Sequence, residues 1–237
     1  NQANNNGGGI YIDYNQDLYA VNTLISDNIA NHDENGNDYG GGILASTSWS
    51  AGYSDFINCT IANNRVDGDN GHGGGFRQDD GGNHRFTNTI IWHNQAANNP
   101  NISGSYDHVT SNIEGDGTTL NTDPLFCDMD SSDYTLQYNS PCIGTGLDGA
   151  NMGAFGVGCF EQYAGPVWYV AVSGSDDANG SIEYPFASIQ KGIDSASDGD
   201  TVLVHEGTYQ ESDLNVLDKA ITVRSVSGYE TTIIQSG

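Results

Sequence analysis

Two aspartates stand at equivalent places in the sequence, and a pair of carboxylates is what glycoside hydrolysis requires. Asp13 and Asp79 follow two Gly triplets at the same offset. Hydrolysis of a glycosidic bond uses two carboxyl groups about 5–9.5 Å apart, depending on its stereochemistry. If the intervening segments stack at the inter-strand spacing, the two side chains would lie about 9.6 Å apart. The alternative interpretation is that both are solvated acids at strand ends.

Three short loops carry several oxygen-bearing side chains, which favours calcium chemistry. Ca²⁺ takes six to eight oxygen ligands, so several carboxylates and carbonyls in one loop can form a site. None of the loops completes the EF-hand pattern, and Asp, Asn and Gly are also ordinary turn residues. The candidate ligands are Asp67 and Asp69 in the first loop, Asp128, Asp130 and Asp133 in the second, and Asp176 and Asp177 in the third.

A repeat of 33 residues is the strongest pattern in the sequence and must position these side chains. Gly triplets begin at Gly7, Gly40 and Gly73, and each precedes a short apolar segment. A second apolar motif bounded by asparagines follows each triplet. Its copies span residues 22–28, 58–64 and 88–94. A fixed period in this range indicates a solenoid.

The repeats have the character of short strands. Their apolar runs are brief, rich in β-branched residues and bounded by Gly and Asn, whereas helical repeats need longer stretches with a period of 3.6. Short strands stacked in parallel register, separated by turns, describe a parallel β-helix. Asn22, Asn58 and Asn88 would then form a ladder of side-chain amides. The Gly triplets would supply the backbone freedom for a tight corner.

Two further groups of short motifs follow the Gly triplets, at residues 88–94, 111–115, 123–126, 133–137, 139–142 and 151–155, and at 168–176, 184–190, 198–204 and 207–209. On these motifs the chain resembles the pectate-lyase-like, right-handed parallel β-helix proteins of bacterial surfaces. Residues 88–159 are similar to the closing coils of such a domain, and residues 168–237 are similar to the opening of another. These similarities imply an all-β fold and cover nearly the whole chain, but they are specific to the fold and not to an activity.

The order of these segments predicts the end of one β-helix followed by the start of a second. We expect the first domain at residues 1–160, a linker at 161–167 and the second domain at 168–237. A short amphipathic capping helix is expected near 185–197, with Pro185 at its start, because an apolar stripe there could cover the unpaired backbone of a first coil. The stripe consists of Phe186, Ile189, Ile193 and Ala196.

Two explanations fit this order. The sequence could be a window cut from a longer tandem protein. Alternatively, the open last coil of one molecule could stack on the first coil of the next, which is a head-to-tail contact that propagates a filament.

Many proteins of this fold cleave acidic polysaccharides, so the resemblance also implies an enzymatic alternative. Lyases of this kind need a base, commonly Lys or Arg, together with Ca²⁺ to neutralise the substrate. Arg77, two residues beyond Gly75, is the only basic residue that closely follows a Gly triplet. The formal net charge of −25 would repel a polyanionic substrate unless many cations were bound. No catalytic signature of the family matches residue by residue.

The chain has four cysteines, of which three fall between residues 127 and 159. Cys59 lies within an asparagine-bounded motif and is expected to be a buried thiol. Cys127 and Cys142 flank the closing coil, so a disulfide between them would contribute about 3 kcal/mol through loop closure. Cys142 with Cys159 is the rival pairing.

The composition limits the classes of function. Asp and Glu outnumber Lys and Arg by 31 to 6, and such a polyanion repels nucleic acids and anionic lipid surfaces. The sequence contains no uninterrupted apolar stretch of about 18–20 residues, which is the length needed to span a membrane. The acidic, Lys-poor composition with clustered cysteines favours an oxidising, extracellular setting.

The sequence therefore predicts a secreted, non-enzymatic β-helix that serves as a structural or adhesive module of a large surface protein or a filament. Its partners would be tandem copies or further copies of the chain, with calcium as the only expected cofactor. Polysaccharide is the expected ligand by analogy with the fold. The aromatic residues that could stack on sugars are Tyr11, Tyr14, Tyr19, Trp49 and Tyr53, although packing in the core or at its rim explains these aromatics equally well. The alternative function is that of a polysaccharide hydrolase or lyase.

Overall fold

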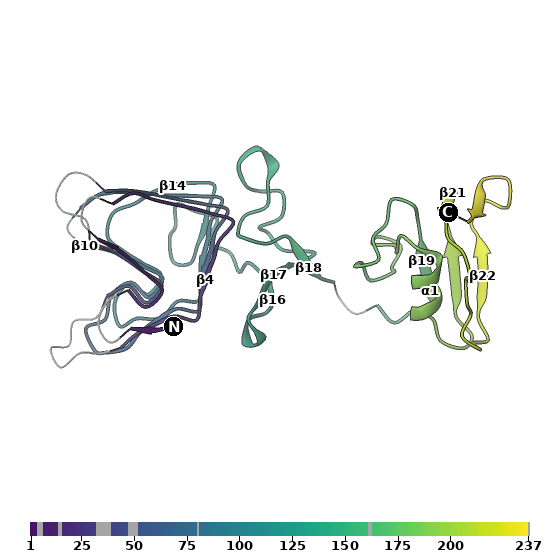
Figure 1. Cartoon of the computed structure of the whole chain (residues 1–237), viewed down its shortest axis with the longest axis horizontal. Coiled ribbons are helices and arrows are strands. Elements are labelled where there is room, and N and C mark those ends of the chain that lie inside the picture. The colour runs from purple at the N-terminus through teal and green to yellow at the C-terminus, as the bar shows by residue number, and fades with distance from the viewer. Residues whose placement is uncertain are drawn as a thin grey trace. The chain divides into compact units, whose positions relative to one another are not determined.

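The computed structural model describes residues 1–3, 7–13, 16–31, 39–46, 52–79, 81–160 and 163–236, so Tyr14 and Trp49 lie outside the described residues. The chain divides into two compact units, Asn1–Gly158 and Cys159–Gly237. Regular structure in both is almost entirely β, with short helical segments only (Figure 1). Among the described residues, no helix has the length and apolar character needed to cross a membrane.

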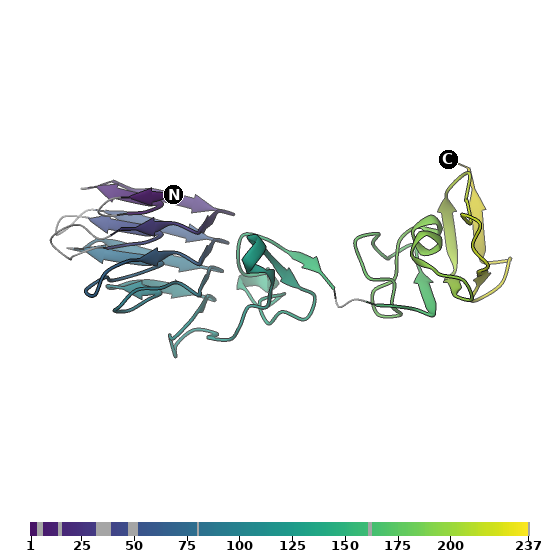
Figure 2. The ribbon, with the colours of Figure 1, turned by 90° about the horizontal axis from the view of Figure 1, so that it is seen from below.

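In the first unit the chain passes four times through three parallel sheets, each of which takes one strand from every pass. A fourth parallel sheet takes one strand from each of the first three passes, and the passes form successive layers (Figure 2). We call them passes 1 to 4. Pass 1 comprises β1 (Gln2–Ala3), β2 (Ile10–Asp13), β3 (Leu18–Val21) and β4 (Leu24–Ser26); pass 2 comprises β5 (Ile29–Ala30), β6 (Ile43–Ser46), β7 (Tyr53–Ile57) and β8 (Thr60–Ala62). Pass 3 comprises β9 (Arg65–Val66), β10 (Phe76–Asp79), β11 (Asn83–Thr87) and β12 (Ile90–Trp92); pass 4 comprises β13 (Ile102–Ser103), β14 (Asp107–Val109) and β15 (Asn112–Ile113).

Equivalent residues of the repeat stack in register, which builds a continuous core. Ile10, Ile43, Phe76 and Ile102 are paired through the sheet of β2, β6, β10 and β13. Side chains alternate between the two faces of a strand, and the inward set belongs to one buried cluster that also holds Phe56, Phe86 and Ile61. Residues that recur at equivalent places in the sequence therefore lie next to one another in the core.

The Gly triplets lie where the chain turns into β2, β6 and β10, and the first Gly of each is left-handed, with φ between +65° and +68°. The second and third glycines lie directly against the next pass. A Cβ placed on Gly41 would approach the carbonyl oxygen of Gly74 to 2.5 Å. The corner needs glycine because the stacked backbones leave no room for a side chain.

We predicted that the first asparagine of each asparagine-bounded motif forms the ladder, but the buried ladder is formed by the last one. Asn58 does donate to Asn22 at 3.3 Å, but the buried ladder consists of Asn28, Asn64 and Asn94. Asn28 donates its backbone N–H and its Nδ2–H to Oδ1 of Asn64, and Asn64 donates the same two groups to Oδ1 of Asn94. The distances are 2.9–3.1 Å. These hydrogen bonds pair polar groups whose burial without a partner would be unfavourable.

The stacked passes end at β15, and the rest of the unit is a small lobe rather than further closing coils. The lobe contains β16 (Phe126–Asp128), the 3-10 helices η1 (Met129–Ser131) and η2 (Leu147–Gly149), β17 (Asp133–Gln137) and β18 (Val157–Cys159). Strands β16 and β17 are antiparallel. Tyr134, Leu136 and Met152 pack with Ala62 and Ile90, so the lobe covers the outer face of the sheet of β4, β8, β12 and β15.

The second unit has a core of its own. Its strands are β19 (Val167–Val170), β20 (Thr201–Val204), β21 (Gly207–Gln210), β22 (Thr222–Ser225) and β23 (Thr232–Gln235), arranged in two parallel sheets. The helix α1 (Ile189–Ser195) is shorter than predicted. Pro185 and Phe186 precede it, because Phe186 bridges to Val170 and the Ser188 side chain caps the helix by accepting from Lys191 N–H. The predicted apolar stripe is nevertheless buried in this core.

Candidate functional site

The predicted catalytic carboxylates lie in line on one sheet. Asp13 pairs with Ser46, and Ser46 pairs with Asp79, so the two carboxylates stand two strands apart. That separation is about 9.6 Å at the inter-strand spacing, which is at the upper limit for an inverting hydrolase.

Arg77, the predicted base, is held by its neighbours. It donates to Ser103 Oγ at 2.6 Å, approaches the Asp79 carboxylate to 3.5 Å and lies over the ring of Tyr39, with Cζ 5.0 Å from the centroid. Leu44, which is aligned with Arg77 on the neighbouring strand β6, is only 2% exposed. A guanidinium fixed by these contacts supports the sheet more directly than it would abstract a proton from a substrate.

The first and second Asp-rich loops are organised by protein donors. Asp67 forms an ion pair with Arg65, with 2.6 Å between Nε and Oδ1. Asp128 caps η1 by accepting from the backbone and hydroxyl of Ser131, and these hydrogen bonds lower its pKa. Asp133 likewise accepts from Thr135. Asp69 and Asp130 lie in the same two loops.

The third loop shows the same behaviour at the start of α1. Asp176 accepts from Ala187 N–H and from both the N–H and the hydroxyl of Ser188, at 2.8–2.9 Å. The backbone N–H of the adjacent Asp177 donates to Ser175. Across the described part of the chain, no three His, Cys, Asp or Glu side chains converge as metal ligands do. Calcium binding stays a prediction that these contacts do not favour.

The cysteine pairings require a correction. Cys142 is a free, fully buried thiol, and so is Cys59. Cys127 and Cys159 are the disulfide-bonded cysteines. Both predicted pairings are therefore wrong, because each used Cys142. The Cys142 thiol instead packs in the core of the lobe, where it accepts from Asn112 Nδ2 at 3.1 Å, and burial raises its pKa.

A cluster on the outward face of the sheet of β3, β7, β11 and β14 combines two of the predicted aromatic candidates with an acidic and a basic residue that we did not single out from the sequence, and we call it the Tyr-Asp-Arg face. It comprises Tyr19, Tyr53, Asp55 and Arg85. Arg85 binds Asp55 through two parallel hydrogen bonds, of 2.9 and 2.7 Å. Tyr53 donates to the same carboxylate at 2.9 Å. The Tyr19 ring is 66% exposed and lies 5.9 Å from the Tyr53 ring.

The electrostatics of this face follow from the ion pair. The hydrogen bonds from Arg85 lower the pKa of Asp55, although burial opposes them, and the same contacts raise the pKa of Arg85. Burial and the bond to Asp55 raise the pKa of Tyr53. The guanidinium also lies over the Tyr53 ring, 5.8 Å from its centroid. The result is a preorganised surface of aromatic rings and hydrogen-bonding groups at neutral pH.

The sequence contained a signal for this face. Tyr19, Asp55 and Arg85 each stand three residues before Asn22, Asn58 and Asn88, and the structure pairs them directly. Comparing the repeats at that offset would have placed an aromatic, an acidic and a basic residue in one row. The contribution of Tyr53 could not be found this way, because its position relative to the others depends on the strand register.

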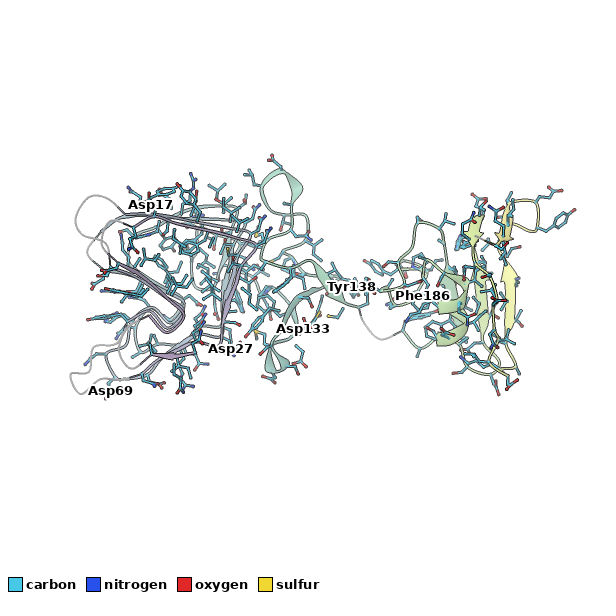
Figure 3. The ribbon with its side chains drawn as sticks, in the orientation of Figure 1. Asp17, Asp27, Asp69, Asp133, Tyr138 and Phe186 are labelled. Carbon is cyan, nitrogen blue, oxygen red and sulfur yellow. The ribbon has the colours of Figure 1, made fainter. Side chains whose placement is uncertain are left out.

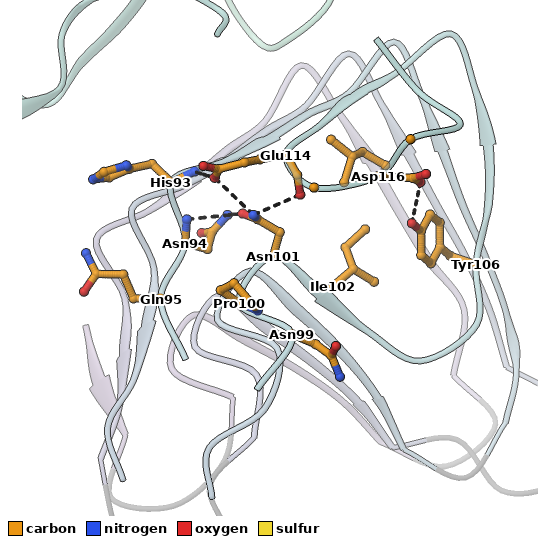
Figure 4. Close-up of a pocket in the computed structure, with 13 residues that line it drawn as sticks. His93, Asn94, Gln95, Asn99, Pro100, Asn101, Ile102, Tyr106, Glu114 and Asp116 are labelled. Carbon is orange, nitrogen blue, oxygen red and sulfur yellow. Dashed lines mark hydrogen bonds between the residues drawn. The ribbon is translucent and has the colours of Figure 1, made fainter. Parts of the chain in front are cut away.

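A cavity with a volume of about 590 Å³ lies at the pass 4 end of the stack. Its apolar floor is formed by Ile102, Tyr106 and Ile113, which belong to or pack against the core of the passes. Tyr106 donates to Asp116 at 2.6 Å (Figure 4). Burial and this carboxylate raise the pKa of Tyr106.

Asn101 and Glu114 form the polar rim of this cavity. Asn101 Oδ1 accepts from the N–H and Nδ2–H of Asn94, at 3.2 and 2.9 Å. Its own amide donates to the Glu114 carbonyl and carboxylate, at 3.2 and 3.1 Å. The same carboxylate accepts from His93 N–H at 2.7 Å. The buried asparagine ladder thus ends on a carboxylate at the cavity.

Comparisons with protein families, with curated proteins and with solved structures find no match for this chain.

Proposed function

We propose that this chain is a structural and adhesive module of an extracellular surface protein, built from right-handed parallel β-helix segments. The support for the fold is the series of parallel sheets that take one strand from each pass in constant register. Because neighbouring passes share backbone hydrogen bonds along every sheet, the stack is stiff, and its functional surface is its strand faces. The disulfide-bonded state of Cys127 and Cys159 supports an oxidising compartment.

The observation that carries an adhesive role is the Tyr-Asp-Arg face. Tyr19 offers an exposed ring for stacking on the apolar face of a sugar, and Arg85, whose side chain is 45% exposed, offers donors to hydroxyl or carboxylate groups. Figure 3 shows side chains projecting from the outer surfaces of the stacked strands in both units. A flat, preorganised face of this kind suits a polymer that lies along the strands better than a small molecule that needs a pocket.

The test is binding of two defined polymers, a neutral β-glucan hexaose and polygalacturonate, measured by calorimetry. The variant is Tyr19→Ala, and the matched control is Tyr11→Ala, which removes a 51% exposed tyrosine from the neighbouring sheet of the same pass. Loss of one stacking ring should weaken binding about threefold to tenfold, while the control retains wild-type affinity. Equal affinities of both variants for every polymer bound, or no binding to either polymer, would remove this face from the proposal.

A polysaccharide hydrolase is the alternative function, and the observation that favours it is the alignment of Asp13 with Asp79. Incubation with the same two polymers, followed by assays for new reducing ends and for unsaturated uronate, separates cleavage from binding. Activity that is lost in Asp79→Asn would establish the enzyme. Undegraded polymers after prolonged incubation with and without Ca²⁺ would leave the adhesive role.

Self-association is the third part of the proposal, with tandem copies or a second chain as partner. The support is the exposed apolar strand residues of the second unit, which include Val223, Ile233 and Ile234. Electron microscopy with and without a calcium chelator is the test. Filaments with the axial repeat of stacked passes would support assembly, and their loss on chelation would place Ca²⁺ at the joints. Discrete particles in both conditions would leave a monomeric module.

A further inference from the structure

The corner that contains the Gly triplets shows where one more pass can be stacked and where it cannot. In passes 1 to 3, the third glycine faces a carbonyl oxygen of the following pass. A Cβ on Gly9, Gly42 or Gly75 would approach that oxygen to 2.6 Å, far closer than real Cβ atoms come. A pass can be followed by another pass only if its corner carries glycine at these positions.

Pass 4 breaks this rule. Strand β13 pairs with β10 so that Ile102 is aligned with Phe76, and residues 99–101 therefore take the place of Gly73, Gly74 and Gly75. These residues are Asn-Pro-Asn. Gly75 and Phe76 still donate to the carbonyls of Pro100 and Asn101, at 3.0 and 2.9 Å. Pass 4 therefore accepts hydrogen bonds from pass 3 as the earlier passes do from their neighbours. Its own corner, however, carries side chains at the place where a carbonyl oxygen of a following pass would lie.

Pro100 removes a hydrogen bond as well as space. The equivalent residues of the first two passes, Gly8 and Gly41, donate their N–H to Gly40 and Gly73 of the following pass, at 3.1 and 3.2 Å. Proline has no N–H and its ring occupies that position. A fifth pass in register would face a missing donor at residue 100 and the Cβ atoms of residues 100 and 101.

Asn101 closes the asparagine ladder from the same corner. In the earlier passes the third glycine lies against the ladder asparagine of its own pass, as Gly75 does against Asn94. Asn101 instead supplies a ladder amide itself, and Glu114 accepts its remaining N–H (Figure 4). The ladder therefore ends with its donors satisfied and a negative charge at the end of the stack.

We propose that the Asn99-Pro100-Asn101 corner, together with Glu114, is a built stop that prevents the first pass of a second copy of this chain from stacking on pass 4. The device acts as edge protection does in other β proteins, by making in-register pairing sterically and electrostatically unfavourable. It gives the first unit a polarity, because assembly through the pass 4 end is blocked. It also leaves the 590 Å³ cavity at this end open.

The test is to restore the glycine corner and to look for association. Pro100→Gly/Asn101→Gly removes both Cβ obstacles and restores the N–H at residue 100. Asn99→Gly is the matched control, because the first residue of the triplet faces its own pass, as Gly73 faces the carbonyl of Phe76. Sedimentation velocity is run in 0.5 M NaCl to screen the negative charge of the chain, and circular dichroism confirms that each variant is folded.

We expect the weight-average mass of the double variant to rise about twofold or more over that of the wild type, while Asn99→Gly sediments as the wild type does. A folded double variant that does not associate overturns the proposal. If that variant does not fold after loss of the Asn101 amide, Pro100→Gly tests the part of the stop assigned to Pro100, since it keeps the ladder closed: association supports the stop, and a monomer refutes the role of Pro100 in it. Wild-type self-association that is lost in Ile102→Asp, on the floor of the same end, also refutes it.

Discussion

At the scale of single residues, burial determines what the four cysteines do. Cys59 and Cys142 have no exposed surface, and burial raises the pKa of both thiols. A buried thiol whose thiolate is disfavoured reacts slowly. The disulfide-bonded pair, Cys127 and Cys159, is unavailable to thiol reagents.

A thiol titration with a chromogenic disulfide reagent checks this assignment. We expect no rapidly reacting thiol in the native protein, two in denaturant without reductant, and four after reduction. Cys59→Ser/Cys142→Ser should show none in unreduced denaturant. Four thiols in unreduced denaturant would mean that the disulfide is absent, and a labelled Cys127 peptide would mean that the pairing differs.

The asparagine ladder also acts at the residue scale. Asn64 is fully buried, accepts two hydrogen bonds from Asn28 and donates to Asn94 and to the Ile25 carbonyl. Its removal leaves several buried donors and acceptors unpaired, and each costs about 1–3 kcal/mol.

Asn64→Ala should therefore lower the free energy of unfolding by about 3–5 kcal/mol, measured by denaturant titration. Asn83→Ala, at an exposed position on β11, is the control, and its effect should stay within about 0.5 kcal/mol. Similar losses in both variants would show that the ladder contributes no more than an ordinary surface amide.

At the scale of elements, the glycine corners hold the passes together. Gly41 has no left-handed φ, so its requirement for glycine comes only from the contacts that a Cβ would make, at 2.5 Å with Gly74 O and 2.6 Å with Arg65 O. Both contacts are with backbone, which cannot move aside without separating the passes.

Gly41→Ala should destabilise the first unit by about 3 kcal/mol or more, as overpacking against backbone does. Gly117→Ala provides the control, because no atom lies within 4 Å of its Cβ position. That variant should be neutral or stabilising by up to about 1 kcal/mol. Thermal melts of the two variants should differ accordingly, and equal melting temperatures would contradict the stacking argument.

The lobe formed by residues 123–158 is held to the stack by Tyr134. The ring is 2% exposed, and its hydroxyl donates to Asp27 Oδ2 at 3.0 Å. Burial, together with this carboxylate, raises the pKa of Tyr134 to about 12. Because the folded pKa exceeds the unfolded value of 10.0, the contribution to stability is complete below pH 10 and is lost as the pH rises towards 12.

Tyr134→Phe should therefore lower stability at pH 8 by about 1.5 kcal/mol, the lower end for hydrogen bonds to charged groups. Its stability should also fall less steeply than that of the wild type between pH 10 and 12. Chemical denaturation at a series of pH values measures both effects. A parallel decline of the two proteins through that range would show that another group titrates there.

At the scale of the whole molecule, the net charge of −25 opposes compactness. Only a few of the acidic groups have a cationic partner among the described residues, Asp55 with Arg85 and Asp67 with Arg65 being the close pairs. The remaining repulsion between exposed charges is screened by salt.

Raising NaCl from 10 mM to 500 mM should increase the melting temperature by about 3 °C, which corresponds to about 1 kcal/mol for a chain of this size. KCl should act identically. CaCl₂ at matched ionic strength provides the comparison for the calcium prediction. A further increase specific to Ca²⁺ would indicate binding by the Asp-rich loops, whereas a fall in melting temperature with NaCl would refute the repulsion argument.

Much of the first unit could be predicted from its sequence, because the features that recur along the chain recur in space. The Gly triplets, the apolar segments and the short strands of passes 1 to 3 all follow from local periodicity. The apolar stripe at Phe186, Ile189, Ile193 and Ala196 was equally local, and it is buried as expected. The start of α1 was not local, because Phe186 is held by a strand from elsewhere in the unit.

The sequence by itself determined the repeat, the strand type and the tight turn at the first glycine of each corner, since each depends on neighbouring residues in the chain. Tertiary structure alone decided which asparagines form the buried ladder, that Cys142 stays free, and that the lobe formed by residues 123–158 covers a sheet face instead of adding coils. It also decided the formation of the Tyr-Asp-Arg face and of the closed corner at Pro100. All of them depend on side chains that meet only when separate passes come together, and no local pattern encodes the register that brings them into contact.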